Sequence, residues 1–268
     1  MQSVVSQLNI YPVKSLQGIK VNTVQVRPRG LSLDRRWMLV DEEGTMLTQR
    51  TLPILSQIGT HLNDDELSLV LEGEQIQVEP PDEDRIEVRV WHDTVLACRI
   101  GGDVSTKLSR FIGQSVKLVW MPDEIQRRVE ERPGTQDKVV GFADGFPFLV
   151  ISEASLEDLN GRLEAAVAMD RFRPNIVVSN TQAFEEDAWK RYEIGGIIFD
   201  HVKPCARCVM TTVDPESGRK GKEPLKTLSL FRQRDGEVFF GQNAVHSGTG
   251  FLTLGDSVKV LERQGVVI

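Results

Sequence analysis

The sequence predicts a mainly β protein with a few helices, an α+β chain. Short segments rich in Val, Ile and Leu recur along the chain, with stretches in which apolar and polar residues alternate. That alternation is the pattern of half-buried strands. Turn signals such as Pro28-Arg29-Gly30 and Asn63-Asp64-Asp65 separate the segments. Many short strands with frequent turns are typical of a barrel or a sandwich.

The expected strands cover residues 4–11, 19–27, 36–41, 66–71, 75–79 and 86–100, then 175–179, 192–203, 208–214, 237–240 and 257–262. The polar stretch 123–144 has little apolar pattern and is expected to be an exposed loop or a connection between domains. We therefore predict two closely associated domains, an N-terminal β domain over residues 1–100 and a second domain over residues 101–268.

Two segments have the spacing of amphipathic helices. The first covers residues 104–112, where Asp103 stands at the N-cap position and apolar residues line one face. The second covers residues 156–168, where Ser155 followed by Asp158 fits a capping box. Few helices among many strands keep the prediction in the mainly β class.

Composition excludes several classes of function. The net charge of -7 and the pI of about 5.3 argue against a nucleic-acid-binding protein, which usually carries a clustered basic face. The first ten residues lack the basic start and apolar run of a secretory signal, and no apolar stretch is long enough for a membrane span. Three cysteines are too few for a disulfide framework. A cytoplasmic protein in a reducing environment is expected.

The pair Cys205 and Cys208 has C-x-x-C spacing, which allows several interpretations. A structural zinc site needs four ligands, and the remaining candidates, Cys98 and four histidines, show no supporting spacing. A thioredoxin-like redox pair should open a helix after a strand, whereas a β-branched run follows Cys208. Two buried small side chains are the simplest alternative.

The neighbours of Cys208 favour a reactive thiolate over a buried thiol. Arg207 precedes Cys208 directly, and a nearby guanidinium stabilises a thiolate. Pro204 stiffens the approach, and Asp214-Pro215 turns the chain away. A thiolate in a rigid, electropositive turn is suited to bind a soft metal centre.

Polar residues stand at the ends of several apolar segments. Lys14 and Ser15 follow the first expected strand, Arg35 precedes the apolar run at 37–40, and Arg173 and Asn175 precede Ile-Val-Val. Arg offers a planar fork to a phosphate, Lys a point charge, and Ser or Asn a neutral donor. Each charge taken alone is explained by a surface ion pair, but together they suit an anionic ligand that carries amide groups.

Other conspicuous residues have ordinary explanations. The four tryptophans, Trp37, Trp91, Trp120 and Trp189, are expected to be core residues because their apolar area is large. His246 is expected to be a loop histidine with its hydrogen bonds satisfied, although it follows Phe240-Gly241-Gln242-Asn243 closely enough to line a pocket.

Seven motifs, in order, carry a family resemblance: Y-P-V-K-S, D-R-R-W-M-L-V-D, S-E-A-S-L-E-D-L-N, R-F-R-P-N-I-V-V, C-A-R-C-x-M-T-T-V-D-P, E-P-L-K-T-L and F-G-Q-N. Together they resemble the MOSC family with its N-terminal β-barrel domain, in the branch that contains the mitochondrial amidoxime-reducing component and its bacterial relatives. The resemblance spans about residues 5–262. It implies a MOSC-type β-barrel domain after an N-terminal β-barrel-like domain.

The resemblance also implies a cofactor and the residues that hold it. The cofactor is molybdenum on the dithiolene of a phosphorylated pterin, molybdopterin, and Cys208 stands where the family's cysteine ligand does. Motif matching places Lys14, Ser15 and Arg35 on the phosphate or pterin, with Arg173, Asn175 and Arg207 on its other side. Ala206 replaces the serine that the family has between the cysteines. Asp144 matches an acidic residue near the metal and is a candidate for proton delivery.

The implied reaction is reduction of the N–O bond in small N-hydroxylated compounds, which takes two electrons and two protons. The chain lacks the C-x4-C-x2-C spacing of a plant-type ferredoxin domain, so no iron–sulfur cluster is expected in it. An external electron-transfer protein of the flavin, ferredoxin or cytochrome b5 type should then supply the electrons. MOSC domains are also associated with sulfur transfer, where the cysteine carries a persulfide. That alternative remains open at the level of sequence.

Overall fold

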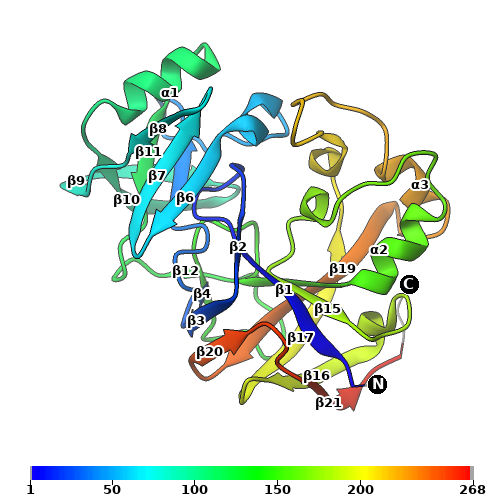
Figure 1. Cartoon of the computed structure of the whole chain (residues 1–268). Helices are drawn as coiled ribbons and strands as arrows, with labels where there is room; N and C mark the ends of the chain where they lie inside the picture. Colours follow the sequence, from blue (N-terminus) through cyan, green and yellow to red (C-terminus); the bar gives the residue numbers. More distant parts are fainter. Residues whose placement is uncertain (1, 266–268) are drawn as a thin grey trace.

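One large sheet dominates the computed structural model, which describes residues 2–265 (Figure 1). In spatial order it contains β2 (Ile19–Val21), β1 (Val4–Ile10), β15 (Ile176–Ser179), β14 (Phe148–Ser152), β19 (Glu237–Ser247), β17 (Ile197–Ala206), β16 (Trp189–Ile194) and β21 (Val258–Arg263), and β18 (Gln233–Arg234) pairs with β19. A bridge between Val4 and Ser257 brings the start of β1 to the chain just before β21, so the sheet curls without fully closing. The mainly β fold class is confirmed.

Four smaller sheets accompany it. They are β5 (Trp37–Val40), β11 (Lys117–Trp120), β10 (Asp93–Ile100) and β9 (Pro81–Val90); β6 (Gly59–Asn63), β7 (Glu66–Leu71) and β8 (Glu74–Gln77); β20 (Gly250–Thr253), β3 (Thr23–Arg27) and β4 (Gly30–Leu31); and the pair β12 (Arg127–Arg128) with β13 (Val139–Val140). The sheets built around β10 and β7 lie together at the upper left of Figure 1 with α1 over them, and the large sheet lies at the lower right. Two sheet-rich halves therefore meet in the middle of the molecule.

Helices are few and short. They are α1 (Val104–Ile112), α2 (Glu153–Asn160) and α3 (Leu225–Ser229), with 3-10 turns η1 (Pro53–Gln57), η2 (Met169–Phe172), η3 (Glu185–Ala188) and η4 (Val209–Thr212). The predicted bounds of α1 are confirmed, but Asp103 makes no side-chain cap and pairs with Lys107 instead. The capping-box prediction for the second helix is wrong. Ser152 caps α2 by accepting a hydrogen bond from the Ser155 amide, so α2 begins earlier than expected and ends at Asn160.

Several predicted strands differ from the structure, and residues 19–27 are divided into β2 and β3, which belong to different sheets. Residues 86–100 form the hairpin β9–β10, and residues 192–203 fall in β16 and β17, which are joined at Gly195 and Gly196, both with positive φ. Residues 208–214 are not a strand, because η4 occupies their centre. A β-branched run can form a 3-10 turn when hydroxyls supply local acceptors and donors; here Thr211 Oγ1 donates to the Cys208 carbonyl at 3.0 Å.

Strands from both ends of the chain share sheets. β1 pairs with β15, and β3 pairs with β20, so these two N-terminal strands are built into the half that contains the large sheet, whereas Val13 and Leu16 between them pack in the core of the other half. The domain boundary near residue 100 stays a prediction. No helix within residues 2–265 is long and apolar enough to cross a membrane.

Two buried histidines in the large sheet predict a loss of stability at acidic pH. Burial lowers the pKa of His201 and of His246 from 6.5 to about 4. Both are therefore neutral when folded and take up protons only on unfolding between about pH 6.5 and 4. Stability then falls as the pH falls through that window, by up to about 1.4 kcal/mol per pH unit for each histidine. His246→Phe keeps an aromatic ring against Phe148 and Phe199. Urea unfolding at pH 7, 6 and 5 should show that this variant has a smaller slope of unfolding free energy against pH than wild type. An unchanged slope would show that His246 does not titrate in this range.

Candidate active site

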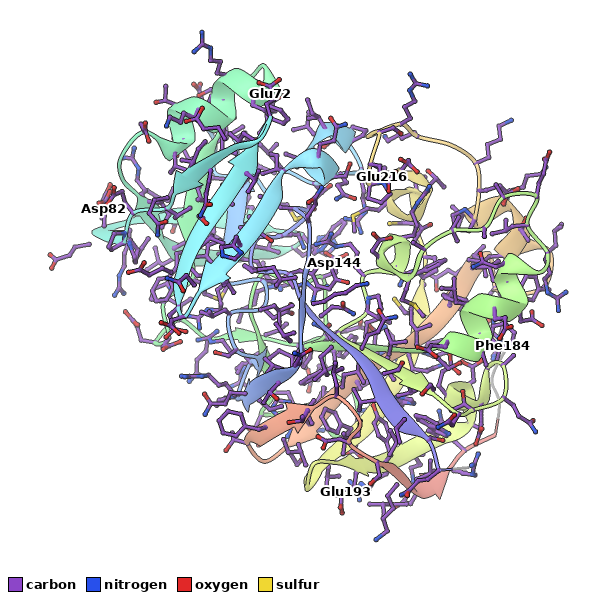
Figure 2. All side chains as sticks on the ribbon, in the orientation of Figure 1. Glu72, Asp82, Asp144, Phe184, Glu193 and Glu216 are labelled. Atoms are coloured by element: carbon purple, nitrogen blue, oxygen red, sulfur yellow. The ribbon has the colours of Figure 1, made fainter. Side chains whose placement is uncertain are left out.

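A cavity of about 120 Å³ lies where the two halves meet. All eight residues singled out from the sequence line it: Lys14, Ser15, Arg35, Asp144, Arg173, Asn175, Arg207 and Cys208. Its lining also contains Arg50, Cys205 and Met210, which the sequence did not single out as contacts of a ligand. Asp144, labelled near the middle of Figure 2, marks its position between the two halves. The eight residues come from loops spread over almost two hundred positions of the chain.

Strand pairing explains why these loops converge. The Asn9 amide donates to the carbonyl of Asn175 at 2.9 Å, and the Asn175 side chain donates to the carbonyl of Asn9 at 3.3 Å. The Oδ1 atom of Asn175 accepts from the Leu149 amide and, at 3.1 Å, from Arg35. Asn175 thus ties β1, β14 and Arg35 together. Lys14 is fixed from the other side, because its amide donates to the Trp37 carbonyl at 2.8 Å.

Three residues at the cavity have left-handed backbone conformations. The φ angles are 70° at Ser15, 48° at Arg35 and 57° at Arg173. Such conformations cost about 1–3 kcal/mol each for a residue with a side chain and concentrate at functional sites. Three of the eight predicted residues therefore have backbone conformations that the surrounding structure must hold in place.

Gly141 is required by the close approach of the Arg35 backbone. A Cβ at residue 141 would lie 2.6 Å from the Arg35 carbonyl oxygen, which already accepts a hydrogen bond from the Phe142 amide at 2.7 Å. Gly141→Ala should therefore displace Arg35 and destabilise the protein by about 1–3 kcal/mol. Gly145→Ala in the same loop is the matched control, since its Cβ would meet nothing within 4 Å. Equal unfolding midpoints for the two variants would contradict this account.

Tyr11 separates two guanidinium groups. Arg35 and Arg173 each lie 4.2 Å from the centre of its ring, and its hydroxyl donates to the Pro174 carbonyl at 3.1 Å. Burial raises the pKa of Tyr11 to about 12 and lowers that of Arg173 to about 10, although nearby charges oppose both changes. Among the described residues, the buried Nη2 of Arg173 has no hydrogen-bond partner. The stack keeps two cations close together at the edge of the cavity.

Asp144 is held between two cations at the opening of the cavity. Its carboxylate lies 2.5 Å from Lys14 Nζ and 2.9 Å from Arg50 Nη2. Desolvation alone would raise the pKa of Asp144, but the charges and hydrogen bonds of Lys14 and Arg50 hold it far below its usual range. Burial lowers the pKa of Lys14 despite the attraction of Asp144. In this arrangement the Asp144 carboxylate is held as an anion beside the Lys14 ammonium group, and its part in proton delivery stays a prediction.

The cation beside Cys208 is not the one expected. Arg207 turns to Cys205, donating from Nη1 to its Sγ at 3.0 Å and from Nη2 to the Phe172 carbonyl at 2.8 Å. The charge and hydrogen bonding of Asp144, followed by those of Cys208, raise the pKa of Arg50 although desolvation opposes them. Arg207 is therefore directed to Cys205, and Arg50 is the cation that interacts with Cys208.

The donor set limits what metal group the cavity can take. No group of three or more His, Cys, Asp and Glu side chains within residues 2–265 is arranged to hold a metal ion, and Cys98 lies apart on β10. The cavity instead offers the Cys208 thiol and five cationic side chains against one carboxylate. Such a set suits a metal that arrives with its own anionic ligands and takes one protein thiolate.

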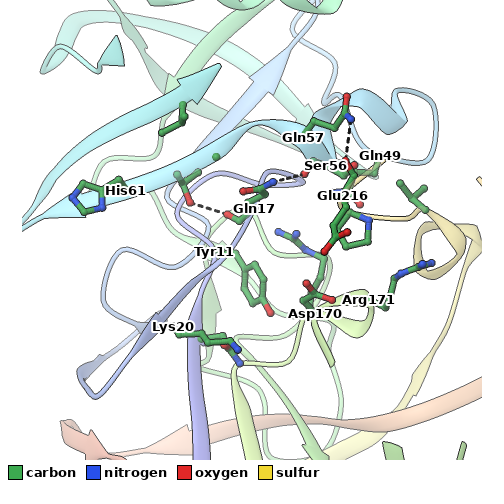
Figure 3. A pocket seen from close by; sticks show the side chains of 18 of the residues that line it. Tyr11, Gln17, Lys20, Gln49, Ser56, Gln57, His61, Asp170, Arg171 and Glu216 are labelled. Carbon is green, nitrogen blue, oxygen red and sulfur yellow. Dashed lines mark hydrogen bonds between the residues drawn. The ribbon is translucent and has the colours of Figure 1, made fainter. Parts of the chain in front are cut away.

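A larger cavity of about 960 Å³ adjoins the first and shares Arg173 and Met210 with it. Figure 3 shows Tyr11, Gln17 and Asp170 on its wall, between chain segments of the two halves. The Gln57 side chain crosses between the halves and donates to the Glu216 carbonyl at 3.2 Å. Two lining segments that are far apart in sequence are thus joined by a hydrogen bond.

Comparisons with known proteins agree over most of the chain. A family model described as the MOSC N-terminal beta barrel domain matches residues 2–115, and one described as the MOSC domain matches residues 137–259. "Mitochondrial amidoxime-reducing component 1" of Mus musculus is 36% identical over 279 residues, covering 96% of this chain and 82% of that protein. Its Homo sapiens counterpart is 34% identical, with the same coverages. "Molybdenum cofactor sulfurase" of Oryza sativa subsp. japonica is 34% identical, covering 87% of this chain and 31% of that protein.

Proposed function

The chain belongs to the MOSC family, and from that premise we propose that it is a molybdenum-cofactor enzyme that reduces N-hydroxylated compounds with electrons from a separate donor protein. The observation that carries the proposal is the cavity itself. It is lined by Cys208 and by five cationic side chains, and three of its lining residues have left-handed backbone conformations. Relatives named amidoxime-reducing components, about 35% identical over most of the chain, support the choice of reaction.

The residues present fit a molybdenum–molybdopterin group. Cys208 supplies a soft ligand, and the buried guanidinium atoms Arg173 Nη2 and Arg207 Nε lack partners among the residues described. An anionic phosphate or dithiolene would satisfy such donors. Lys14, Ser15 and Arg35 would hold the group from the N-terminal half, and Arg173, Asn175 and Arg207 from the other. When bound, the group supplies two-electron redox chemistry that no amino-acid side chain provides.

The chain's own residues have three tasks in this reaction. Reduction consumes two electrons and two protons, and turns an N–OH group into N–H with release of water. Lys14 holds a proton at Nζ in a site where burial favours its release. Asp144 fixes Lys14 and Arg50 in place, and Arg50 brings a positive charge to Cys208. The cations together lower the free energy of an anionic group in the cavity.

Metal analysis and a turnover assay test this proposal. Protein purified from a host that makes the cofactor should contain about one molybdenum and one pterin per chain. It should oxidise a reduced viologen dye in the presence of an amidoxime and release the amidine. The dye stands in for the flavin, ferredoxin or cytochrome b5-type donor. If molybdenum stays absent after incubation with mature cofactor, the proposal is wrong.

A sulfur-carrier role is the second candidate, favoured by the relative named molybdenum cofactor sulfurase. Cys205 lines the same cavity, and the guanidinium of Arg207 at 3.0 Å from its Sγ would stabilise a persulfide anion there. Protein isolated with a persulfide should release thiocyanate when treated with cyanide. Thiocyanate in proportion to protein, without molybdenum, would favour this role over reduction.

A further inference from the structure

Trp91 is the exception among the tryptophans expected in the core. It lies in the turn between β9 and β10 with 43% of its surface exposed, whereas Trp37 and Trp189 are buried. Its φ angle is 58°, a left-handed conformation that is an outlier for a bulky residue. Neither the exposure of a large apolar surface nor this backbone conformation stabilises the fold. The two-residue hairpin turn requires a positive φ at this position, but it does not require a large aromatic side chain there.

The indole of Trp91 contacts two residues that line the active-site cavity. Its Nε1 donates to Asp144 Oδ1 at 3.2 Å, and the guanidinium of Arg50 lies 4.5 Å from the ring centre. Arg50 in turn reaches Asp144 and interacts with Cys208. Indole, guanidinium and thiol therefore form a continuous path from the protein surface into the cavity.

We propose that Trp91 is the docking residue for the planar, conjugated part of an uncharged N-hydroxylated substrate, whose N–OH group then enters the cavity. This inference rests on the reductase function proposed above and adds a substrate class to it. Aromatic surfaces bind planar conjugated groups by stacking. Since Trp91 projects from the N-terminal half and Asp144 from the other, the substrate would contact both halves at once.

The cations around Trp91 outnumber the Asp144 carboxylate and disfavour a positively charged ligand. The Arg50 cation already covers one face of the ring, and four further cationic side chains line the cavity behind it. An amidoxime is neutral at pH 7, whereas the amidine formed from it is a strong base: R–C(NH₂)=NOH + 2e⁻ + 3H⁺ gives R–C(NH₂)₂⁺ + H₂O. Like charges repel at short range. The excess of cations therefore weakens binding of the cationic product relative to the neutral substrate.

Kinetics and direct binding of matched substrates test this inference on the cofactor-loaded protein. The probes are an amidoxime with a phenyl ring and one with a methyl group. Trp91→Ala should raise KM and the calorimetric Kd for the phenyl compound by about tenfold more than those for the methyl compound. Trp91→Phe keeps a ring but loses the N–H, and should restore most of the affinity. Phe251→Ala, an exposed aromatic on β20, is the control and should resemble wild type.

The possible outcomes separate this inference from the function it rests on. If wild type turns over neither compound but binds the phenyl one through Trp91, the reductase function fails and the docking site stands. If wild type is active and Trp91→Ala affects both compounds equally, the docking role is wrong. If Trp91→Phe behaves like Trp91→Ala, the hydrogen bond to Asp144 and not the ring is what matters, which also overturns it. A phenyl amidine that binds as tightly as its amidoxime would refute the charge selection.

Discussion

Replacing Cys208 with serine is expected to reduce amidoxime turnover by at least about a thousandfold, which corresponds to about 4 kcal/mol of transition-state stabilisation. A serine hydroxyl at neutral pH is neither an anion nor a soft ligand, so it cannot replace the thiolate that the metal group would bind. The side chain is only half-buried and lies at the start of η4. The melting temperature of the apoprotein should therefore change by no more than about 2 °C, since the volume change is small.

The other two cysteines serve as controls for this experiment. Cys98→Ser removes a buried thiol on β10, far from the cavity lining, and should affect stability without a specific loss of molybdenum. Cys205→Ser should leave molybdenum bound under the reductase function and abolish persulfide under the sulfur-carrier one. If Cys208→Ser retains both metal and turnover, Cys208 is not the ligand.

Lys14→Met is expected to lower both molybdenum content and turnover by about 10- to 100-fold. Its Nζ lies in the N-terminal half, donates to the Phe142 carbonyl at 2.8 Å and is one of the five cations around the cavity. A hydrogen bond to a charged group contributes about 1.5–3 kcal/mol, which is the source of that range. The apoprotein should lose about 1–3 kcal/mol of stability, because the Phe142 carbonyl is left without the Lys14 ammonium group while Asp144 keeps Arg50 as a partner.

A surface lysine provides the comparison. Lys259 on β21 is exposed and does not line the cavity, so Lys259→Met should keep its molybdenum. Retention of the metal by Lys14→Met would mean that the N-terminal half does not contribute to the site. A drop in stability of the apoprotein by several kcal/mol would instead assign Lys14 a structural role.

Local sequence was a good guide to elements whose stabilising contacts are local. The bounds of α1 followed from its apolar spacing and from Gly113, which ends it in a left-handed conformation. The start of α2 did not follow, because Ser155 is not a surface cap: its hydroxyl donates to the buried Glu186 carboxylate 31 positions away. Likewise, the turn at Trp91 that divides residues 86–100 into two strands has no glycine or proline to mark it.

The composition of the candidate site was accessible from sequence, but its pairings were not. Motifs located eight residues that the fold brings to one cavity. They could not tell that Arg207 would turn to Cys205, because adjacent residues in an extended segment point in different directions. Arg50 carried no signal, since Thr48-Gln49-Arg50 lies in a loop without periodicity. Its role depends on long-range contacts with Asp144 and Cys208, which only the assembled fold defines.

The position of β1 has a consequence for synthesis of the chain. This strand lies between β2 and β15, and β15 is made about 170 residues after β1. At about 5–20 residues per second, one edge of β1 waits roughly 10 to 30 seconds on the ribosome for its partner. An unpaired, apolar strand edge is a template for aggregation. Newly made chains should therefore depend on chaperones, and cofactor can be inserted only after translation has passed Cys208.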